Sequence, residues 1–233
     1  DAAASHLKLR AFTPEIVLER QVRRATNRGE TLAEFVASVA SNKPVPGGGS
    51  VAAYVGSLGA ALAQMVAGLT IGRKKYTAVE SQMIEIAKKA ASLTAQLSAL
   101  VARDSDAYAK VSAAYKLPKD TEANHAARAA AIEEALTEAS VVPLETARLC
   151  AEVAELAAVV AEDGNSNALS DAGVAALLAE AAAKGAGYNV RINAQSLTDR
   201  AAAGVLVTEA DAHVARASEL ARAAEKILEK ALG

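Results

Sequence analysis

The turn Pro44–Ser50, with the sequence Pro-Val-Pro-Gly-Gly-Gly-Ser, is the first place in this chain where ligand chemistry is expected. It supplies free backbone N–H groups at the start of an apolar helix, where proteins often bind anions and carbonyl oxygens. Glycines there also allow a sharp turn and close packing, and the pattern leaves both interpretations open. The glycines lack the spacing of a dinucleotide fingerprint, and no P-loop lysine follows them.

Asp104 is the candidate for proton transfer, because it interrupts an apolar stripe. Apolar residues recur in steps of four and three from Val79 to Leu100, and the continued steps reach Asp104. A carboxylate at a core position costs free energy unless it has a partner or a chemical task. Arg128 occupies the apolar face of a later helix, so it is either the buried partner of such an aspartate or a ligand for an anion.

Further polar groups lie where predicted helices begin or end. Asp171 falls in the first turn of a helix that Ser170 caps, just after the polar segment Gly164–Asn167. Arg73, Lys74 and Lys75 follow a helix C-terminus, where cations complement the helix dipole. Three adjacent cations would also suit a polyanionic ligand tail, and both interpretations stay open.

Histidine and cysteine offer little chemistry in this sequence. His6, His125 and His213 are isolated from one another and from the polar turns, so neither a zinc site nor Ser-His-Asp catalysis has support. General acid–base catalysis would therefore require an Asp, Lys or Tyr side chain. The single cysteine, Cys150, excludes an internal disulfide and fits a reducing cytoplasm.

The elements that must position these groups are predicted to be helices almost throughout. The composition is 52% apolar but only 3% aromatic, and many alanines favour closely packed helices over a sheet. We expect an all-α bundle of long antiparallel helices. Caps, glycines and prolines place the helices at residues 13–27, 31–41, 50–71, 77–116, 121–139, 143–163 and 170–187, then from 188 onward and at 208–232.

Three local signals set boundaries within this series. Thr77 and Glu80 have the pattern of a capping box at the start of the longest helix. Pro143 is expected to end one helix and begin another. Gly185 and Gly187 are expected to end the helix that begins near residue 170.

Charge and hydropathy bear on the possible partners. The chain has 25 basic and 27 acidic residues, so nothing attracts nucleic acid or an anionic membrane. Residues 51–71 carry no formal charge and are long enough to cross a bilayer. They are mostly alanine and glycine, with Gln64 in the middle, and such residues drive insertion weakly. We therefore expect a buried helix in a soluble, cytoplasmic protein with no membrane or nucleic-acid partner.

In their order and spacing, several segments between Thr31 and Asp199 resemble the cyclodeaminase/cyclohydrolase family of one-carbon folate enzymes. That family comprises the cyclodeaminase domain of formiminotransferase-cyclodeaminase and stand-alone methenyltetrahydrofolate cyclohydrolases. The segments are the glycine-rich turn, Leu69-Thr-Ile-Gly-Arg-Lys-Lys-Tyr76, Asp104 with Ala107-Tyr108, Leu117-Pro118-Lys119 with Thr121, Val142-Pro143-Leu144-Glu145, Gly164-Asn165 with Ser170-Asp171, and Asn189-Val-Arg-Ile-Asn193.

The resemblance implies an all-helical homodimer with its folate site near the subunit interface. Cyclodeaminases of the family close 5-formiminotetrahydrofolate to 5,10-methenyltetrahydrofolate and release ammonia. Cyclohydrolases add water to the methenyl compound and give 10-formyltetrahydrofolate. Both reactions pass through a tetrahedral carbon between two folate nitrogens and need neither a metal nor a nucleotide. The expected ligand is a tetrahydrofolate derivative, with or without a polyglutamate tail; an inactive folate-binding or scaffolding protein is the remaining alternative.

The first residues help to choose between the two reactions. Residues 5–20 resemble the closing strand and helix of a glutamate formiminotransferase domain, which favours the cyclodeaminase. The chain also begins at Asp1 without a methionine, as a fragment of a longer protein would. We expect residues 1–30 to be an appendage from such a domain and residues 31–233 to be the helical enzyme domain, fused to or neighbouring a formiminotransferase.

The positions of the polar residues, taken with the resemblance, lead to hypotheses about their roles. Asp104 is expected to transfer a proton or to stabilise a cation. Asp171, at a helix N-terminus, is expected to stabilise the positively charged amidine of the substrate. The expected binding residues are Asn165 and Asn189 for the pterin, Pro46, Gly47, Gly48, Gly49 and Ser50 for the polar edge of the ligand, and Lys74, Lys75 and Arg128 for the glutamate tail. No metal ligand is predicted.

Overall fold

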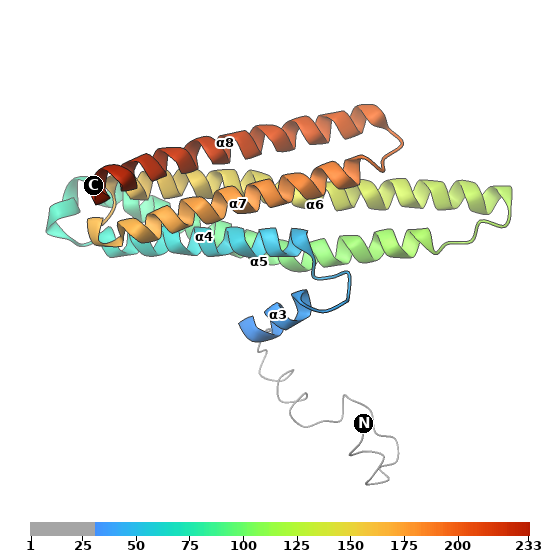
Figure 1. Ribbon diagram of the computed structural model, residues 1–233, viewed down its shortest axis with the longest axis horizontal. Helices are drawn as coiled ribbons and strands as arrows, with labels where there is room; N and C mark the ends of the chain where they lie inside the picture. The colour runs from blue at the N-terminus through green and yellow to red at the C-terminus, as the bar shows by residue number, and fades with distance from the viewer. Residues whose placement is uncertain (1–30) are drawn as a thin grey trace, which may run out of the picture. The chain divides into compact units, whose positions relative to one another are not determined.

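The computed structural model describes residues 31–233, and every regular element in this range is a helix, which confirms the predicted all-α fold (Figure 1). The chain divides into two compact units, residues 1–43 and 44–233. The predicted helix from Thr13 and the stretch 5–20 lie outside the described residues. The elements are α3 (Leu32–Val39), α4 (Gly48–Thr70), η2 (Lys74–Val79), α5 (Glu80–Tyr115), α6 (Glu122–Asp163), η3 (Ser166–Ala168), α7 (Leu169–Ala194) and α8 (Arg200–Leu232).

Helix α3 belongs to the first unit and begins as the sequence predicts. The Oγ1 atom of Thr31 accepts the N–H of Glu34 at 3.3 Å, and the Glu34 carboxylate accepts the N–H of Thr31 at 2.9 Å. This reciprocal capping box satisfies two backbone donors of the first turn. The second unit begins at Pro44, and the domain boundary predicted after residue 30 stays a prediction.

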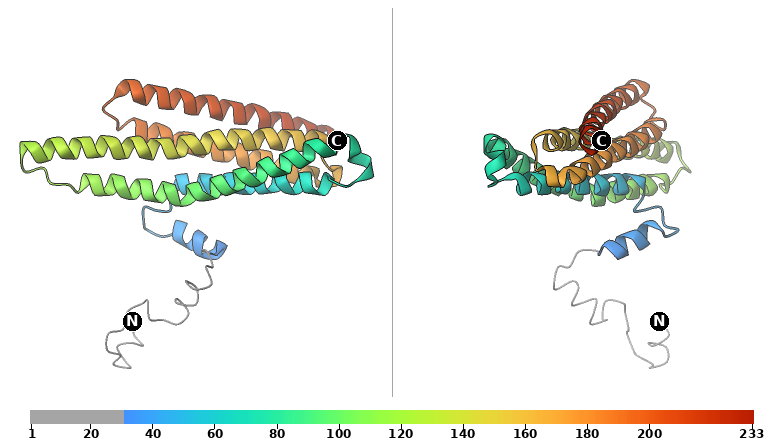
Figure 2. Two further views of the ribbon diagram at one scale, coloured as in Figure 1. Left: turned by 180° about the vertical axis from the view of Figure 1, so that it is seen from behind. Right: turned by 60° about the vertical axis from the view of Figure 1, so that its left-hand side comes forward.

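The second unit is a bundle in which α4, α5, α6, α7 and α8 follow one another in antiparallel order (Figure 2). Its core consists largely of alanine, with larger side chains such as Met83, Leu97 and Leu149 fully buried. Small residues let the helices approach closely, since a Cβ added at Gly56 of α4 would lie 2.6 Å from Sγ of Cys150 on α6. Burial raises the pKa of the Cys150 thiol to about 12, so this cysteine is a packing residue rather than a nucleophile.

Helix α4 is long and apolar enough to cross a membrane, and half of its most apolar window is buried inside the bundle. It packs against α5, α6 and α7. Helices with these packing partners are common in the cores of soluble proteins, and a single span of this kind is weak support for a membrane protein. Burial accounts for the lack of charge on one side of α4, whereas the other side carries exposed apolar side chains.

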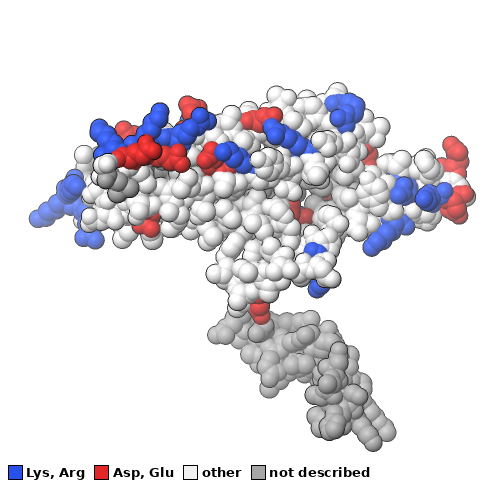
Figure 3. All heavy atoms as spheres, in the orientation of Figure 1, with Lys and Arg blue, Asp and Glu red and all other residues white. Residues whose placement is uncertain are grey.

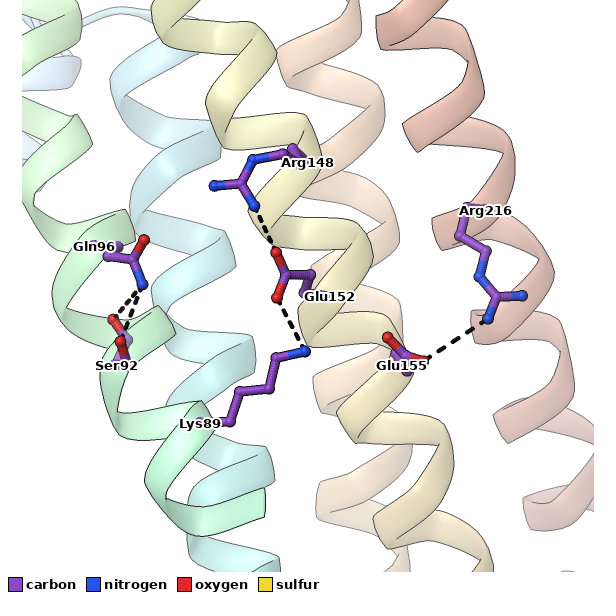
Figure 4. A network of polar contacts seen from close by, with 7 residues as sticks. All are labelled: Lys89, Ser92, Gln96, Arg148, Glu152, Glu155 and Arg216. Carbon is purple, nitrogen blue, oxygen red and sulfur yellow. Dashed lines mark hydrogen bonds and ion pairs between the residues drawn. The ribbon is translucent and has the colours of Figure 1, made fainter. Parts of the chain in front are cut away.

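Ion pairs connect α5, α6 and α8 on one side of the bundle (Figure 4). Glu152 on α6 accepts from Arg148 at 2.6 Å and from Lys89 of α5 at 3.0 Å, and Arg216 of α8 lies 4.0 Å from Glu155. These groups are partly solvated, so each pair adds little stability. Charged side chains in Figure 3 gather along α8 and at the ends of the bundle, and α4 itself contains no charged residue.

Four predicted boundaries are wrong. Helix α6 continues through Pro143, and α7 continues through Gly185 and Gly187. Gly187 serves close packing instead, since a Cβ there would lie 2.9 Å from a methyl group of Val214 on α8. No Thr77 capping box forms, because the Thr77 hydroxyl donates to the carbonyl of Lys74 within the short helix η2. Helix α8 also begins before the predicted residue 208, at Arg200, where the Asp199 carboxylate caps it.

Candidate active site

A cleft of about 290 Å³ lies at the N-terminal end of α4. Five parts of the bundle form it: the loop before α4, the first turn of α4, the second half of α5, the middle of α6 and the last turns of α7. The residues that matter for its chemistry are Gly47, Gly48, Gly49, Asp104, Asn189 and Asn193. The predicted residue Pro46 lies in the same loop, after a cis Val45–Pro46 peptide bond, but does not line the cleft.

Asp104 is held against the start of α4 by Ser50. The fully buried hydroxyl of Ser50 donates to Oδ2 of Asp104 at 2.8 Å and lies 3.2 Å from the hydroxyl of Ser105. The carboxylate is half-buried and lines the cleft. The sequence predicts that Asp104 has either a partner or a chemical task. In the structure Asp104 has a hydrogen-bond partner and also lines the cleft, where a ligand can reach it. That partner is Ser50, so of the two interpretations of Arg128 the one that pairs it with Asp104 is wrong.

Gly49 shows why the turn needs glycine at the start of α4. A Cβ built on it would overlap Oδ1 of Asp104 and would lie 2.6 Å from its Cγ. Glycine at this position therefore lets the carboxylate lie directly against the helix backbone. Gly47 and Gly48 line the cleft beside it. The turn thus serves close packing and site formation together.

Two asparagines one turn apart on α7 form the opposite wall. The side-chain N–H of Asn189 donates to the carbonyl of Gly185 at 2.9 Å, and that of Asn193 donates to the carbonyl of Ala139 on α6 at 2.7 Å. Asn189 was predicted as a ligand residue from the sequence. Asn193 and the half-exposed Tyr108, which also lines the cleft, were not assigned a role. The i, i+4 spacing of the two asparagines was the available signal for Asn193.

A second polar cleft, of about 380 Å³, lies at the other end of α4. It contains the predicted residues Lys74, Lys75 and Asn165, together with Tyr76 and Ser166. Asn165 holds this turn on α4, because its backbone N–H donates to Oγ1 of Thr70 at 2.9 Å and its side-chain N–H donates to the carbonyl of Leu69 at 2.9 Å. We call this the basic cleft.

Tyr76 is the most perturbed titratable group of the basic cleft. Its hydroxyl lies 3.1 Å from the hydroxyl of Ser166 and accepts the backbone N–H of Ser166 at 2.9 Å. These two contacts, with a smaller effect of Lys75, lower the pKa of Tyr76 to about 8. The Lys75 ammonium also lies 5.1 Å from the centre of the Tyr76 ring. The phenolate form is therefore reached close to physiological pH.

We expect a step in tyrosinate absorbance centred near pH 8 that is absent in Tyr76→Phe. Because the pKa lies below its ordinary value, the added negative charge appears as the pH rises through 8, and it should weaken anion binding beside Lys75. An ultraviolet pH titration measures the step. Tyr188→Phe, which changes a tyrosine that is 66% exposed, should keep it. A step that survives in Tyr76→Phe would assign the low pKa to another group.

The predicted site residues do not converge within one chain. Helix α4 has 23 residues, so its two ends, with Asp104 at one and Lys74 at the other, lie about 35 Å apart. Asp171 is half-buried in the first turn of α7, which follows the η3 turn of the basic cleft. Arg128 lies in a third place: it donates to the carbonyl of Tyr115 at 3.2 Å and stacks over the ring of Tyr115, so it secures the end of α5.

The fold and the cleft define a class: an all-helical bundle with a cleft lined by a carboxylate, two amides and a glycine-rich helix start. In the described residues no group of three or more His, Cys, Asp or Glu side chains is arranged for a metal. The profile of the formiminotransferase-cyclodeaminase family matches residues 31–212, and the chain belongs to this family. The resemblance stated from the sequence is thereby confirmed.

Individual relatives differ in length and in the activity for which they are named. A methenyltetrahydrofolate cyclohydrolase from Methylorubrum extorquens is 47% identical over 191 residues, which cover 82% of this chain and 92% of the relative. A formimidoyltransferase-cyclodeaminase from Rattus norvegicus is 40% identical over 72% of this chain but only 31% of the relative. The solved formiminotetrahydrofolate cyclodeaminase of Thermotoga maritima has a TM-score of 0.80 at 32% identity, and 89% of this chain covers all of it.

Proposed function

We propose that this chain is a formimidoyltetrahydrofolate cyclodeaminase, which closes 5-formiminotetrahydrofolate to 5,10-methenyltetrahydrofolate with release of ammonia. Family membership supports a folate cyclodeaminase or cyclohydrolase function. The observation that carries the finer choice is the match to the Thermotoga maritima cyclodeaminase over that whole chain. The resemblance of residues 5–20 to the end of a glutamate formiminotransferase domain favours the same choice, with that domain as a fused or neighbouring partner in the cytoplasm.

Asp104 is the proposed proton-transfer group. N10 of the folate attacks the carbon of the positively charged formimino group. A carbon–N10 bond forms, the carbon–nitrogen π bond of the formimino group breaks, and the N10 proton passes to Asp104. The tetrahedral carbon then carries N5, N10 and the amino group. Return of the proton to the amino group breaks the carbon–nitrogen bond, ammonia leaves, and the lone pairs of N5 and N10 stabilise the methenyl cation. A neighbouring carboxylate also stabilises that positive charge.

The second candidate is the cyclohydrolase reaction, which the 47% identity to a cyclohydrolase, over 92% of that protein, favours. Water adds to the methenyl carbon and one of its protons passes to Asp104, which leaves a hydroxyl group on the tetrahedral carbon. The carbon–N5 bond then breaks as N5 takes the proton from Asp104, and the hydroxyl proton leaves to solvent as the carbonyl forms. The product is 10-formyltetrahydrofolate. The same carboxylate and the same tetrahedral carbon serve both reactions, so the geometry of the cleft alone favours neither.

Supplying both substrates to the purified chain tests the proposal. Ammonia release from 5-formiminotetrahydrofolate, with growth of methenyl absorbance, is the expected result. Loss of methenyl absorbance without ammonia release would assign the cyclohydrolase reaction instead. No turnover of either compound would contradict an enzymatic role for this chain and favour a folate-binding or scaffolding one.

We further propose that the chain forms a homodimer through an apolar face of α4 and α7. Large apolar side chains that are 41% to 66% exposed form this face, although soluble monomers rarely expose apolar patches of this extent. They are Leu58, Met65, Leu69, Val174, Leu177, Tyr188 and Ile192. The face runs between the two clefts. A two-fold axis across its middle would place each active-site cleft beside the partner's basic cleft, which supplies cations for the glutamate tail.

Leu177→Glu is expected to convert the dimer to a monomer and to abolish most of the turnover. A charge in an apolar interface is poorly solvated, so the dimer dissociation constant should rise about a hundredfold or more. Size-exclusion chromatography with light scattering measures the mass. Val205→Glu on α8, which is 65% exposed, is the matched control and should stay dimeric. A fully active wild-type monomer would refute the shared site.

A further inference from the structure

Pro143 leaves one backbone carbonyl of α6 without its helical partner. In an α-helix the carbonyl of residue 139 accepts the N–H of residue 143, and proline has no N–H. The proline ring also crowds this carbonyl. Helix α6 nevertheless continues to Asp163. The free carbonyl therefore needs a donor from outside its own helix.

Asn193 of α7 is that donor. Its Nδ2 atom lies 2.7 Å from the oxygen of Ala139, a short bond between two residues that both line the active-site cleft. Because the acceptor is a carbonyl, the amide must present N–H to it, and the amide orientation is fixed. The other end of the amide, Oδ1, accepts no hydrogen bond from the described residues. This oxygen remains available as an acceptor for a ligand.

The side-chain amide of Asn189 also has a bonded N–H donor and a free oxygen acceptor. Its Nδ2 donates to Gly185 at 2.9 Å within α7, and its Oδ1 has no donor among the described residues. The cleft thus has two free amide acceptors one helical turn apart, with the carboxylate of Asp104 also facing it. A wall of acceptors favours a ligand edge that carries several N–H donors or a positive charge.

We infer that Asn193 binds an N–H group of the folate ring system and that Pro143 is its positioning residue, because the missing N–H of Pro143 fixes the Asn193 amide with its oxygen toward the ligand. The inference rests on the proposed function, which puts a reduced pterin in this cleft. The amino group and ring N–H of a pterin are donors on one edge, and they match the acceptor wall.

The test is a double-mutant cycle with Asn193→Ala and Pro143→Ala, using the folate that the wild-type chain turns over. Asn193→Ala removes the acceptor and should raise KM about tenfold. Pro143→Ala restores a helical N–H for Ala139, releases the Asn193 amide and should raise KM about threefold. In both variants kcat should stay within about twofold. The double variant should match Asn193→Ala, because Pro143 acts only through Asn193.

Stability separates positioning from a purely structural role. Pro143→Ala removes a proline from a helix interior, so its Tm should be unchanged or higher although its KM is worse. Pro118→Ala, in the loop between α5 and α6, is the control and should leave KM unchanged. A lower Tm with wild-type KM in Pro143→Ala, or effects on KM that multiply in the double variant, would overturn the inference. Failure of the proposed function is a separate result, since it appears as absence of turnover in the wild type.

Discussion

Asp104→Asn is expected to lower kcat about a hundredfold or more, because the amide neither takes nor returns the proton that the reaction moves. The substitution is nearly isosteric. The oxygen of the new side chain can still accept the Ser50 hydroxyl, which lies 2.8 Å from the carboxylate in the wild type. Binding should therefore change much less than turnover, and KM should stay within a few-fold of the wild-type value.

Asp106→Asn is the matched control for Asp104→Asn. Asp106 lies two residues further along α5 and is exposed, so it loses the same charge without touching the cleft. Its kcat should equal that of the wild type, and both variants should melt close to the wild-type Tm. Turnover within a few-fold of the wild type for a folded Asp104→Asn variant would show that another group moves the proton. Asp171 would then be the next candidate to test.

Local patterns predicted most of the fold and the central residue of the cleft. The helix of residues 80–115 follows from its own apolar periodicity, and the same periodicity singled out Asp104 as a polar group at a core position. The Thr31 capping box is also local, since donor and acceptor lie three residues apart. In these cases the atoms that stabilise the structure belong to neighbouring residues of the sequence.

The remaining features depend on contacts between distant residues. Pro143 was expected to break a helix because its own segment has no substitute donor; that donor is Asn193, 54 positions away in the chain. Likewise, periodicity placed Arg128 on an inward face without showing that its neighbour is Tyr115 rather than Asp104. A pattern specifies a face of a helix, and tertiary packing decides which residue meets it.

Gly49→Ala is the second variant with a large expected effect, because the Asp104 carboxylate lies where the new Cβ would be. The added Cβ would overlap Oδ1 of Asp104 and lie 2.9 Å from Oδ2, the oxygen that Ser50 binds. Helix α4 is packed on three sides, so the carboxylate has to move and the Ser50 hydrogen bond is lost. We expect kcat to fall about tenfold to a hundredfold, and the free energy of unfolding to fall by about 1–3 kcal/mol, as is typical of overpacking.

Two controls separate the contact between the new Cβ and the Asp104 carboxylate from a general effect of introducing alanine. Gly204→Ala on α8 meets nothing within 4 Å and should leave stability unchanged or raise it by up to about 1 kcal/mol. In an Asp104→Ala background the three nearest atoms that Gly49→Ala would meet are gone, so its destabilisation should disappear. Urea unfolding of the four members of this cycle measures the coupling. Equal destabilisation in both backgrounds would mean that Gly49 is required for the backbone of the turn, not to make room for the carboxylate.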